Sequence, residues 1–268
     1  MAIQQQGAAA PIRQPLAGNT DTSLLKILAL IFMVVDHVSI AFPPQIRELR
    51  MLGRIAMPLY VWCLVVGSEY THDALKYALR LFILGAISQP LYIMALGATW
   101  TKLNILFLLC LGVLAIAGIQ KRWYYSQFWA PALGLLLTLL VNVDYGWKGF
   151  VFILFLYASR KSKGSLAVAF LVSAVIWGYA SYPVTSFFGI KFAFLTGNIL
   201  SPILQLFFQM QSLMWMALPL ILIQTHSNIR IPKWLGYGLY PLHLLALVLI
   251  GLLSGIPVDW YINALKAV

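Results

Sequence analysis

The stretch LLKILALIFMVVDHV at residues 24–38 decides the fold class of this chain. It is apolar apart from Lys26, Asp36 and His37. A helix that spans a bilayer needs about 20 mostly apolar residues, so this run predicts a membrane-spanning helix. A charged side chain at bilayer depth costs about 2.5–3.5 kcal/mol or more, and such residues usually face protein or water at a functional site. The three polar residues are therefore the first site candidates.

The composition extends this reading to the whole chain. The 268 residues are 62% hydrophobic and 9% charged, with a mean hydropathy of +0.87, whereas soluble domains carry about 25% charged residues. The sequence predicts an all-α polytopic integral membrane protein. Its net charge of +11 comes from residues in short loops, where they fix topology and contact anionic lipids, so no nucleic-acid partner is inferred. Cys63 and Cys110 lie in apolar runs and are expected to be buried, with neither a disulfide nor a metal site.

The length of a bilayer span divides the chain into a flexible tail at residues 1–22 and a single transmembrane domain at residues 23–268. About nine helices are expected, within a range of eight to eleven. They cover residues 23–42, 51–69, 75–96, 103–119, 126–142, 147–159, 165–181, 203–225 and 236–255. Glycines and prolines interrupt residues 182–202, which are expected to form a re-entrant or interfacial piece, or a further span.

Basic residues predict the orientation of the chain. With a cytosolic N-terminus, eleven of the 18 Lys and Arg residues fall on the cytosolic side and seven on the other. The positive-inside rule therefore favours a cytosolic N-terminus and a cytosolic tail.

Two residues near the first turn are expected to form an ion pair. The first two helices run antiparallel across a short turn with Pro43 and Pro44, and Asp36 and Arg54 lie about equally far from it. Each is one to two turns into its helix, about 6–9 Å along the axis. His37 should point elsewhere because adjacent helical positions do not share a face, and it lies nearly in line with Lys26, eleven residues earlier.

Other polar residues fall near the same ends of their helices. Gln89 precedes the kink at Pro90, Asn104 begins a helix, and Asp144 and Tyr145 lie in the turn DYGWKG. Together they could line one outward-facing cavity. The alternative is that each caps a helix or satisfies a neighbour, which we weigh equally for Asn104 and Asp144.

The last apolar run, GYGLYPLHLLAL, contributes a second histidine. Tyr240 and His243 are three residues apart on one helical face, with Pro241 between them. The alternative for His243 is a single bond to a backbone carbonyl. His72 and His226 fall in loops and are expected on the surface.

These residue types suit acyl transfer. A neutral imidazole in a protected site can take a proton from an attacking amine or hydroxyl, or attack a thioester itself. Asp36 and Arg54 would then fix geometry and charge. Loop cations, Lys121–Arg122 and Arg160–Lys161 among them, could hold the phosphates of a donor such as coenzyme A, or could be topology signals alone. The sequence holds no Gly-rich phosphate loop, GxSxG elbow or metal-ligand spacing.

Five blocks resemble the TraX family, membrane proteins encoded with conjugative pili whose namesake acetylates the pilin N-terminus; TrbP is a relative. The blocks are LKILALIFMVVDHV at 25–38, LGRIAMPLYVWCLVVG at 52–67, NILF at 104–107, DYGWKG at 144–149 and YPLHLLAL at 240–247. The resemblance implies a fold like that of multi-helix membrane acyltransferases, in the bacterial inner membrane. It also implies acetyl-CoA as co-substrate and a membrane-embedded pilin subunit as partner.

By this resemblance His37, Asp36 and His243 are the expected catalytic residues, and the expected supporting or substrate-binding residues are Arg54, Lys26, Asn104, Asp144 and Tyr240. Straight helices would place His37 and His243 about 10 Å apart in depth. Either an extended thioester arm bridges them, or only one belongs to the reaction centre. Besides acetyl transfer, we weigh peptide cyclisation as another pilin-maturation activity, and a non-enzymatic assembly factor or transporter.

Overall fold

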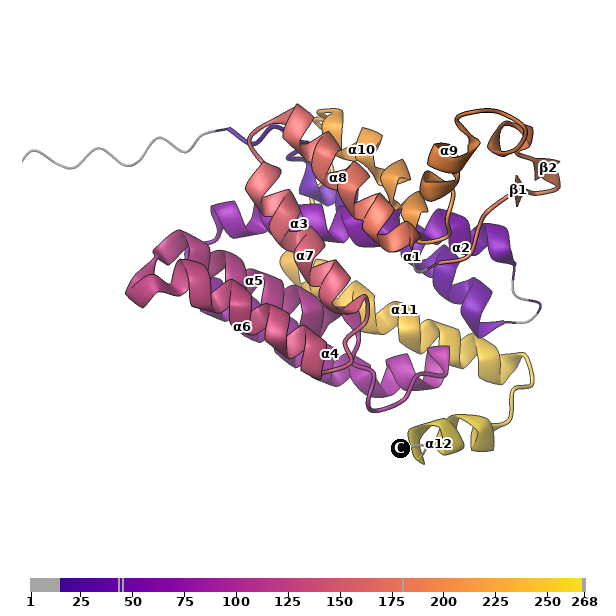
Figure 1. The fold of residues 1–268 in the computed structure, drawn as a ribbon. Coiled ribbons are helices and arrows are strands. Elements are labelled where there is room, and N and C mark those ends of the chain that lie inside the picture. The colour runs from indigo at the N-terminus through magenta and orange to yellow at the C-terminus, as the bar shows by residue number, and fades with distance from the viewer. Residues whose placement is uncertain (1–14, 43, 45, 180, 267–268) are drawn as a thin grey trace, which may run out of the picture.

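The computed structural model describes residues 15–42, 44, 46–179 and 181–266, and shows an irregular bundle of helices (Figure 1). Four helical segments are long and apolar enough to cross a membrane: Thr22–Ala41, Arg47–Tyr70, Ala74–Leu96 and Leu235–Leu253. Shorter apolar helices cover Ile105–Lys121, Gly146–Ser159, Lys163–Gly178 and Ser212–Leu222. The predicted helical fold class is thus confirmed, with a candidate span at the predicted residues 23–42, and the number of about nine transmembrane helices stays a prediction.

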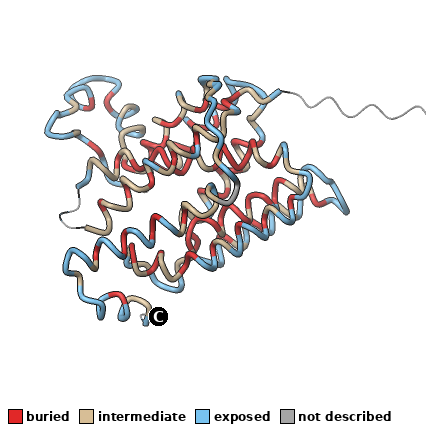
Figure 2. The backbone as a smooth tube through the Cα atoms, turned by 180° about the vertical axis from the view of Figure 1, so that it is seen from behind, coloured by how far each residue is buried: buried red, intermediate tan, exposed pale blue. Residues whose placement is uncertain are grey.

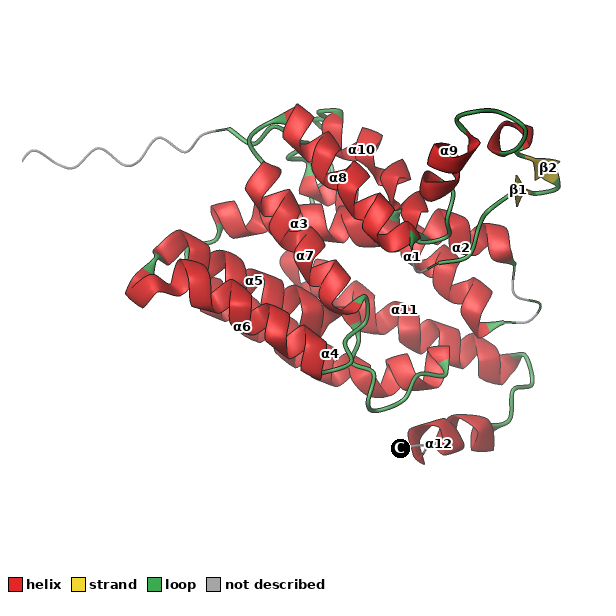
Figure 3. Ribbon diagram, viewed as in Figure 1, coloured by secondary structure: helices red, strands yellow, loops and turns green. Residues whose placement is uncertain are grey.

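The elements follow one another along the chain with short connections, and the described residues contain strand only at β1 and β2 (Figure 3). The first half contains α1 (Thr22–Ala41), α2 (Arg47–Gly53), α3 (Ala56–Tyr70), α4 (Ala74–Leu96), α5 (Ile105–Lys121), η1 (Trp123–Tyr125), α6 (Ser126–Leu140) and α7 (Gly146–Ser159). The second half contains α8 (Lys163–Gly178), β1 (Ser186–Phe187), β2 (Ile190–Lys191), η2 (Ala193–Leu195), α9 (Ser201–Phe207), η3 (Ser212–Ala217), α10 (Leu218–Leu222), α11 (Lys233–Leu253) and α12 (Val258–Lys266).

The chain runs back and forth between two ends of the bundle. We call the end where α1 begins the proximal end, and the opposite end, where α1 finishes, the distal end. At the proximal end Ala17 N donates to Arg160 O over 2.8 Å. At the distal end Leu103 N donates to Asn142 O over 2.9 Å. The basic loops after α5 and α7 therefore lie at the proximal end, as the predicted topology groups them.

Residues just before α1 pack against the bundle. Asn19 is buried and donates to Thr225 Oγ1 over 2.8 Å, while its carbonyl accepts from Trp62 Nε1 over 2.7 Å. Residues 1–14 lie outside the described part of the chain. The flexible tail expected over residues 1–22 is therefore ordered in its last part, because residues 15–21 close the proximal end of the core.

The core centres on α3, and Figure 2 shows the buried segments running through the middle of the bundle. Leu59, Val61, Trp62 and Val65 of this helix are fully inaccessible to solvent. The outer helices instead expose large apolar side chains in helical stripes. On α4 these are Leu75, Leu79, Phe82, Ile83 and Ile87. Exposed apolar stripes of this extent are typical of a lipid-facing surface.

The second span, Arg47–Tyr70, is one helical segment that is irregular between Gly53 and Ala56. It confirms the helix predicted over residues 51–69, although α2 ends at Gly53 and α3 begins at Ala56, with Arg54 and Ile55 in right-handed helical conformations between them. Pro58 explains the break, because its ring displaces the carbonyl of the residue four positions earlier, Arg54, and it has no N–H to donate there. Arg54 thus caps α2 at a helix break beside α1.

The segment predicted as a helix at residues 203–225 is wrong as a single helix. The chain leaves α9 at Phe208, and residues 182–184 pair with residues 208–210 through hydrogen bonds from Val184 N to Phe208 O and from Met210 N to Tyr182 O. These hydrogen bonds use backbone N–H and C=O groups that would otherwise pair within a continuous helix. Residues 182–202 form a loop with the hairpin β1–β2 and the short η2, which excludes a further helical span there.

Gly53 allows α1 and α2 to approach closely, which yields a stability prediction. A Cβ added at Gly53 would lie 2.3 Å from the Cβ of Asp36. We expect Gly53→Val to lower the free energy of unfolding by about 1–3 kcal/mol, since overpacking forces the helices apart. The measurement is thermal unfolding in detergent. Gly238→Ala is the matched control, because its Cβ would lie 3.9 Å from Leu242 Cδ1; equal melting temperatures for both variants would contradict the account.

Candidate functional site

Two histidines from opposite ends of the sequence meet inside the bundle. His37 Nδ1 of α1 lies 2.9 Å from His243 Nε2 of α11. The ring centroids are 5.1 Å apart and the planes differ by 25°. Because the nitrogen–nitrogen contact is much shorter than the centroid separation, the rings meet by their edges through a hydrogen bond and not by their faces.

This contact corrects the expected 10 Å difference in depth between the two histidines. That estimate assumed straight helices that start at the same level. The hydrogen bond requires α11 to be displaced along α1, so that its middle meets the distal half of α1. No extended arm is needed to connect the two rings, and both histidines belong to one centre.

The hydrogen bonds define which histidine nitrogen carries a proton. His243 Nδ1 lies 3.1 Å from Leu239 O, and a carbonyl can only accept, so this nitrogen carries hydrogen. In neutral His243 the Nε2 atom is then an acceptor, and His37 Nδ1 must donate to it. Neutral His37 is left with a bare Nε2, and the residue is partly buried. We assign His37 as the basic histidine and His243 as the residue that orients it.

Tyr240 adjoins this pair, as its spacing from His243 predicted. The two rings pack edge to face with centroids 5.3 Å apart, and Tyr240 is 7% exposed. Pro241 lies between them inside α11. It leaves the Tyr237 carbonyl without its helical donor.

The predicted ion pair between Asp36 and Arg54 is confirmed, at 2.6 Å between Asp36 Oδ1 and Arg54 Nη2. Arg54 also donates through Nη1 to Gln211 Oε1 over 3.1 Å and through Nε to Arg50 O over 3.1 Å. Arg50 Nε lies 3.7 Å from the same Asp36 oxygen. The buried pair therefore joins α1, α2 and the turn before η3, and its members compensate each other's charge.

Sequence reasoning missed Arg50 and Gln211. Arg50 could have been found, since it precedes Arg54 by four residues and shares its helical face. Gln211 lies after α9 in a segment without helical periodicity, so its position in the sequence does not indicate which helix it contacts.

Asn104 and Gln89 do not line an open cavity, contrary to one expectation. Asn104 is fully buried and caps α5 by accepting from Leu106 N over 3.1 Å. Its amide donates to Gly85 O and to Gln89 Oε1 over 2.8 and 2.9 Å, while Gln89 Nε2 donates to Lys102 O. These groups clamp α4 to α5, which is the structural alternative weighed above for Asn104.

Asp144 and Tyr145 form the edge of the charged centre. Asp144 lies 3.4 Å from Lys102 Nζ. Burial raises the pKa of Asp144, and the charges of Lys102 and Arg54 oppose this shift. Burial likewise raises the pKa of the Tyr145 phenol, which Arg54 counteracts. Both loop residues therefore lie within electrostatic range of the ion pair with Asp36.

A cavity of about 410 Å³ lies near the proximal end, and neither His37 nor His243 is among the residues that line it. Lys26 and Arg80 line it on α1 and α4, and Tyr240 lines it on α11. Its volume falls in the range of small-molecule sites. About 16 Å of helix separates Lys26 from His37, at 1.5 Å per residue, and no residue of α1 beyond Lys26 lines the cavity.

The remaining candidates lie apart from the centre. His72 and His226 are exposed, as predicted. Cys63 and Cys110 are buried free thiols, also as predicted. Cys63 lines the cavity, with Sγ 3.8 Å from Thr22 O.

Fold and site define an α-helical membrane protein with a buried centre of two histidines and an ion pair. The model of the family described as TraX protein matches residues 21–251, and the chain belongs to this family. Both histidines, the ion pair, Asn104 and Asp144 fall within the match.

Three relatives show partial similarity. An uncharacterised protein of Rickettsia prowazekii is 33% identical over 46% of this chain and 49% of its own length. Protein TraX of Escherichia coli is 30% identical over 57% of this chain and 63% of its own. A probable fimbrial assembly protein FimC of Dichelobacter nodosus is 36% identical over 25% of this chain and 30% of its own. The chain thus covers under two thirds of each relative, and no solved structure matches.

The ion pair yields a double-mutant prediction. Asp36→Asn and Arg54→Gln should each lower the free energy of unfolding by about 3–5 kcal/mol, because each leaves a buried partner uncompensated. The double variant should lose less than the sum by at least about 1 kcal/mol. Reversible unfolding in detergent measures the cycle. The exposed Asp73–Lys76 pair serves as control and should show no coupling. Additive losses at Asp36 and Arg54 would contradict the network.

Proposed function

We propose that this chain is a membrane-bound acetyltransferase that moves an acetyl group from acetyl-CoA to an amine of a pilin subunit. The observation that carries the proposal is the His37–His243 hydrogen bond, because it leaves a basic nitrogen on a partly buried ring beside a buried ion pair. A group of this kind suits general-base catalysis.

In the proposed reaction His37 Nε2 accepts a proton as the amine nitrogen attacks the thioester carbonyl. A carbon–nitrogen bond forms, the carbon–sulfur bond breaks, and the thiolate leaves with a proton returned from His37. The products are an acetylated amine and coenzyme A. His243 orients His37 and shares the charge of its protonated form, in the way a third group orients a catalytic base.

The cavity of about 410 Å³ fits the donor in its chemistry. Lys26 and Arg80 supply positive charge for phosphates near its proximal end. The rings of Tyr60, Tyr77 and Tyr237 line the wall along which a thioester arm would extend. Tyr240 closes the inner end and touches His243. A donor bound in this cavity would lie at the proximal end, which the basic loops predict to be cytosolic.

The family and relatives support a pilus-related role in the bacterial inner membrane. One relative is named for TraX and another for fimbrial assembly. A pilin subunit held in the bilayer would reach the centre from the membrane or from the distal end. Asp144 and Tyr145 lie at the distal end, in the loop between α6 and α7.

The direct test is the intact mass of a candidate pilin co-expressed with this protein. We expect a gain of one acetyl group with the natural sequence, and a loss of at least about 100-fold in initial rate with His37→Gln, in line with the contribution of a general base. His226→Gln is the control, since this histidine is exposed on a loop.

Other masses would select the other functions. Loss of one water that depends on His37 would indicate peptide cyclisation in place of acetylation. An unchanged mass, with both proteins expressed and folded, would contradict modification of that pilin and favour an assembly or transport role.

A second prediction concerns the donor cavity. Coenzyme A in large excess should raise the melting temperature of the purified protein, because a ligand at 100 times its Kd stabilises by about 2.7 kcal/mol. Lys26→Gln combined with Arg80→Gln should reduce this shift. Lys76→Gln is the control on the same helix, with an exposed side chain outside the cavity. No shift for the natural protein would count against a coenzyme A site.

A further inference from the structure

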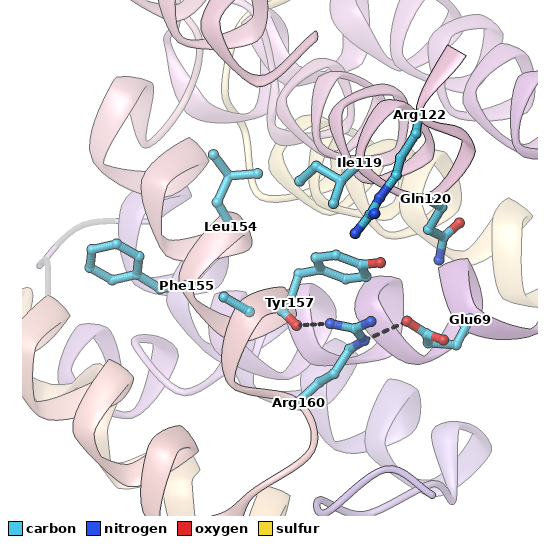
Figure 4. Close-up of a pocket in the computed structure, with 9 residues that line it drawn as sticks. Glu69, Ile119, Gln120, Arg122, Leu154, Phe155, Tyr157 and Arg160 are labelled. Carbon is cyan, nitrogen blue, oxygen red and sulfur yellow. Dashed lines mark hydrogen bonds and ion pairs between the residues drawn. The ribbon is translucent and has the colours of Figure 1, made fainter. Parts of the chain in front are cut away.

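A second cavity of about 740 Å³ opens at the proximal end, between the ends of α3, α5 and α7 (Figure 4). Its wall shares no residue with the lining of the donor cavity. Arg122 and Arg160 supply its positive charge, and Ile119, Leu154 and Phe155 supply an apolar side. The proposed reaction uses none of these residues.

Arg160 is held firmly in this cavity. Its Nε lies 2.5 Å from Glu69 Oε1, and its Nη1 donates to Tyr157 O over 2.6 Å. The guanidinium carbon lies 3.8 Å from the centroid of the Tyr157 ring. Such bonds fix the direction of the planar guanidinium and limit the entropy lost when it binds an anion.

Arg122 faces the same space from the other side. It ends α5 in a left-handed conformation with φ of 51°. Figure 4 shows its side chain extending toward the ring of Tyr157, with Arg160 on the far side of that ring. Two arginines against one glutamate leave the cavity with a net positive charge.

The turn after Arg122 places this charge at a membrane surface. Trp123, Tyr124, Tyr125 and Phe128 are 68–77% exposed, and Trp129 donates to Tyr124 O over 3.0 Å. Exposed Trp and Tyr residues next to apolar helices are typical of the headgroup region. Arg122 therefore lies at the depth of lipid phosphates. Leu154 and Phe155 precede Arg160 on α7 by more than one turn, so they lie deeper, at the depth of acyl chains.

We propose that this cavity binds an anionic phospholipid. The phosphate binds the guanidinium of Arg122, Arg160 adds positive charge from beyond the Tyr157 ring, and an acyl chain lies along Ile119, Leu154 and Phe155. The apolar side favours a lipid over a free phosphate, which would gain nothing from it. The bound lipid would tie α5 to α7 at the proximal end. This proposal requires a membrane-spanning chain and is independent of acetyl transfer.

The test uses the full chain purified in a neutral detergent, with phosphatidylglycerol or phosphatidylcholine added. Native mass spectrometry counts bound lipids, and titration gives their affinity. We expect one phosphatidylglycerol to bind more tightly than phosphatidylcholine. Arg122→Gln should weaken phosphatidylglycerol about tenfold, the loss of about 1.4 kcal/mol that one charge-assisted bond supplies. Lys121→Gln is the control, since Lys121 does not line the cavity.

Arg122→Gln leaves the Glu69–Arg160 pair in place. Arg122→Lys keeps the positive charge and therefore tests whether loss of that charge causes the weaker lipid binding. The lysine variant should retain a preference for phosphatidylglycerol. Equal affinity in the natural protein and Arg122→Gln would overturn the proposal. Displacement of the lipid by coenzyme A or by inorganic phosphate at equal concentration would also overturn it, since a soluble anion would then be the occupant.

Discussion

The hydrogen bond between His37 and His243 constrains the arrangement of the helices around it. Its two residues are 206 positions apart, so the bond fixes how far α11 is displaced along α1. The hydrogen bond between two neutral imidazoles also has a defined donor and a defined acceptor. The Leu239 carbonyl sets the proton on one ring, and that ring sets the proton on the other. The backbone of α11 thereby determines which nitrogen of α1 is basic.

The neighbouring ion pair holds α1 in the position that this bond requires. Asp36 is adjacent to His37 in sequence, and Arg54 binds it at the helix break that Pro58 imposes. Removing two charges from water is costly, and the cost is offset only when all their hydrogen-bonding groups are used. Gln211, in the turn before η3, accepts a further hydrogen bond from Arg54. The ion pair thus holds α1 against α2, which suits a base that must keep one orientation.

Local rules predicted part of this centre. Antiparallel helices joined by a short turn bring residues of equal depth together. This rule predicted the pair of Asp36 and Arg54. The three-residue spacing in a helix found Tyr240 beside His243. Family blocks found both histidines. Each of these predictions depends on one helix or on one short turn, where sequence spacing and spatial distance are closely related.

The failures concern relations between distant elements. The contact of His37 with His243 depends on how α11 is displaced along α1, which side-chain packing decides and hydropathy does not. Residues 203–225 are apolar enough for a helix, yet their backbone pairs with residues 182–184. The pairing of Asn104 with Gln89 depends on how α4 lies against α5. In each of these cases tertiary packing overrode the structure that the local sequence pattern predicted.

The most direct test of this account is nitrogen NMR on protein labelled with ¹⁵N in its histidine rings, with His37→Gln and His243→Gln used for assignment. The account predicts hydrogen on Nδ1 of both rings, an unprotonated Nε2 on His37, and a scalar coupling across the hydrogen bond between His37 Nδ1 and His243 Nε2. Hydrogen on Nε2 of both neutral rings, or signals of one histidine that do not change when the other is replaced, would contradict it.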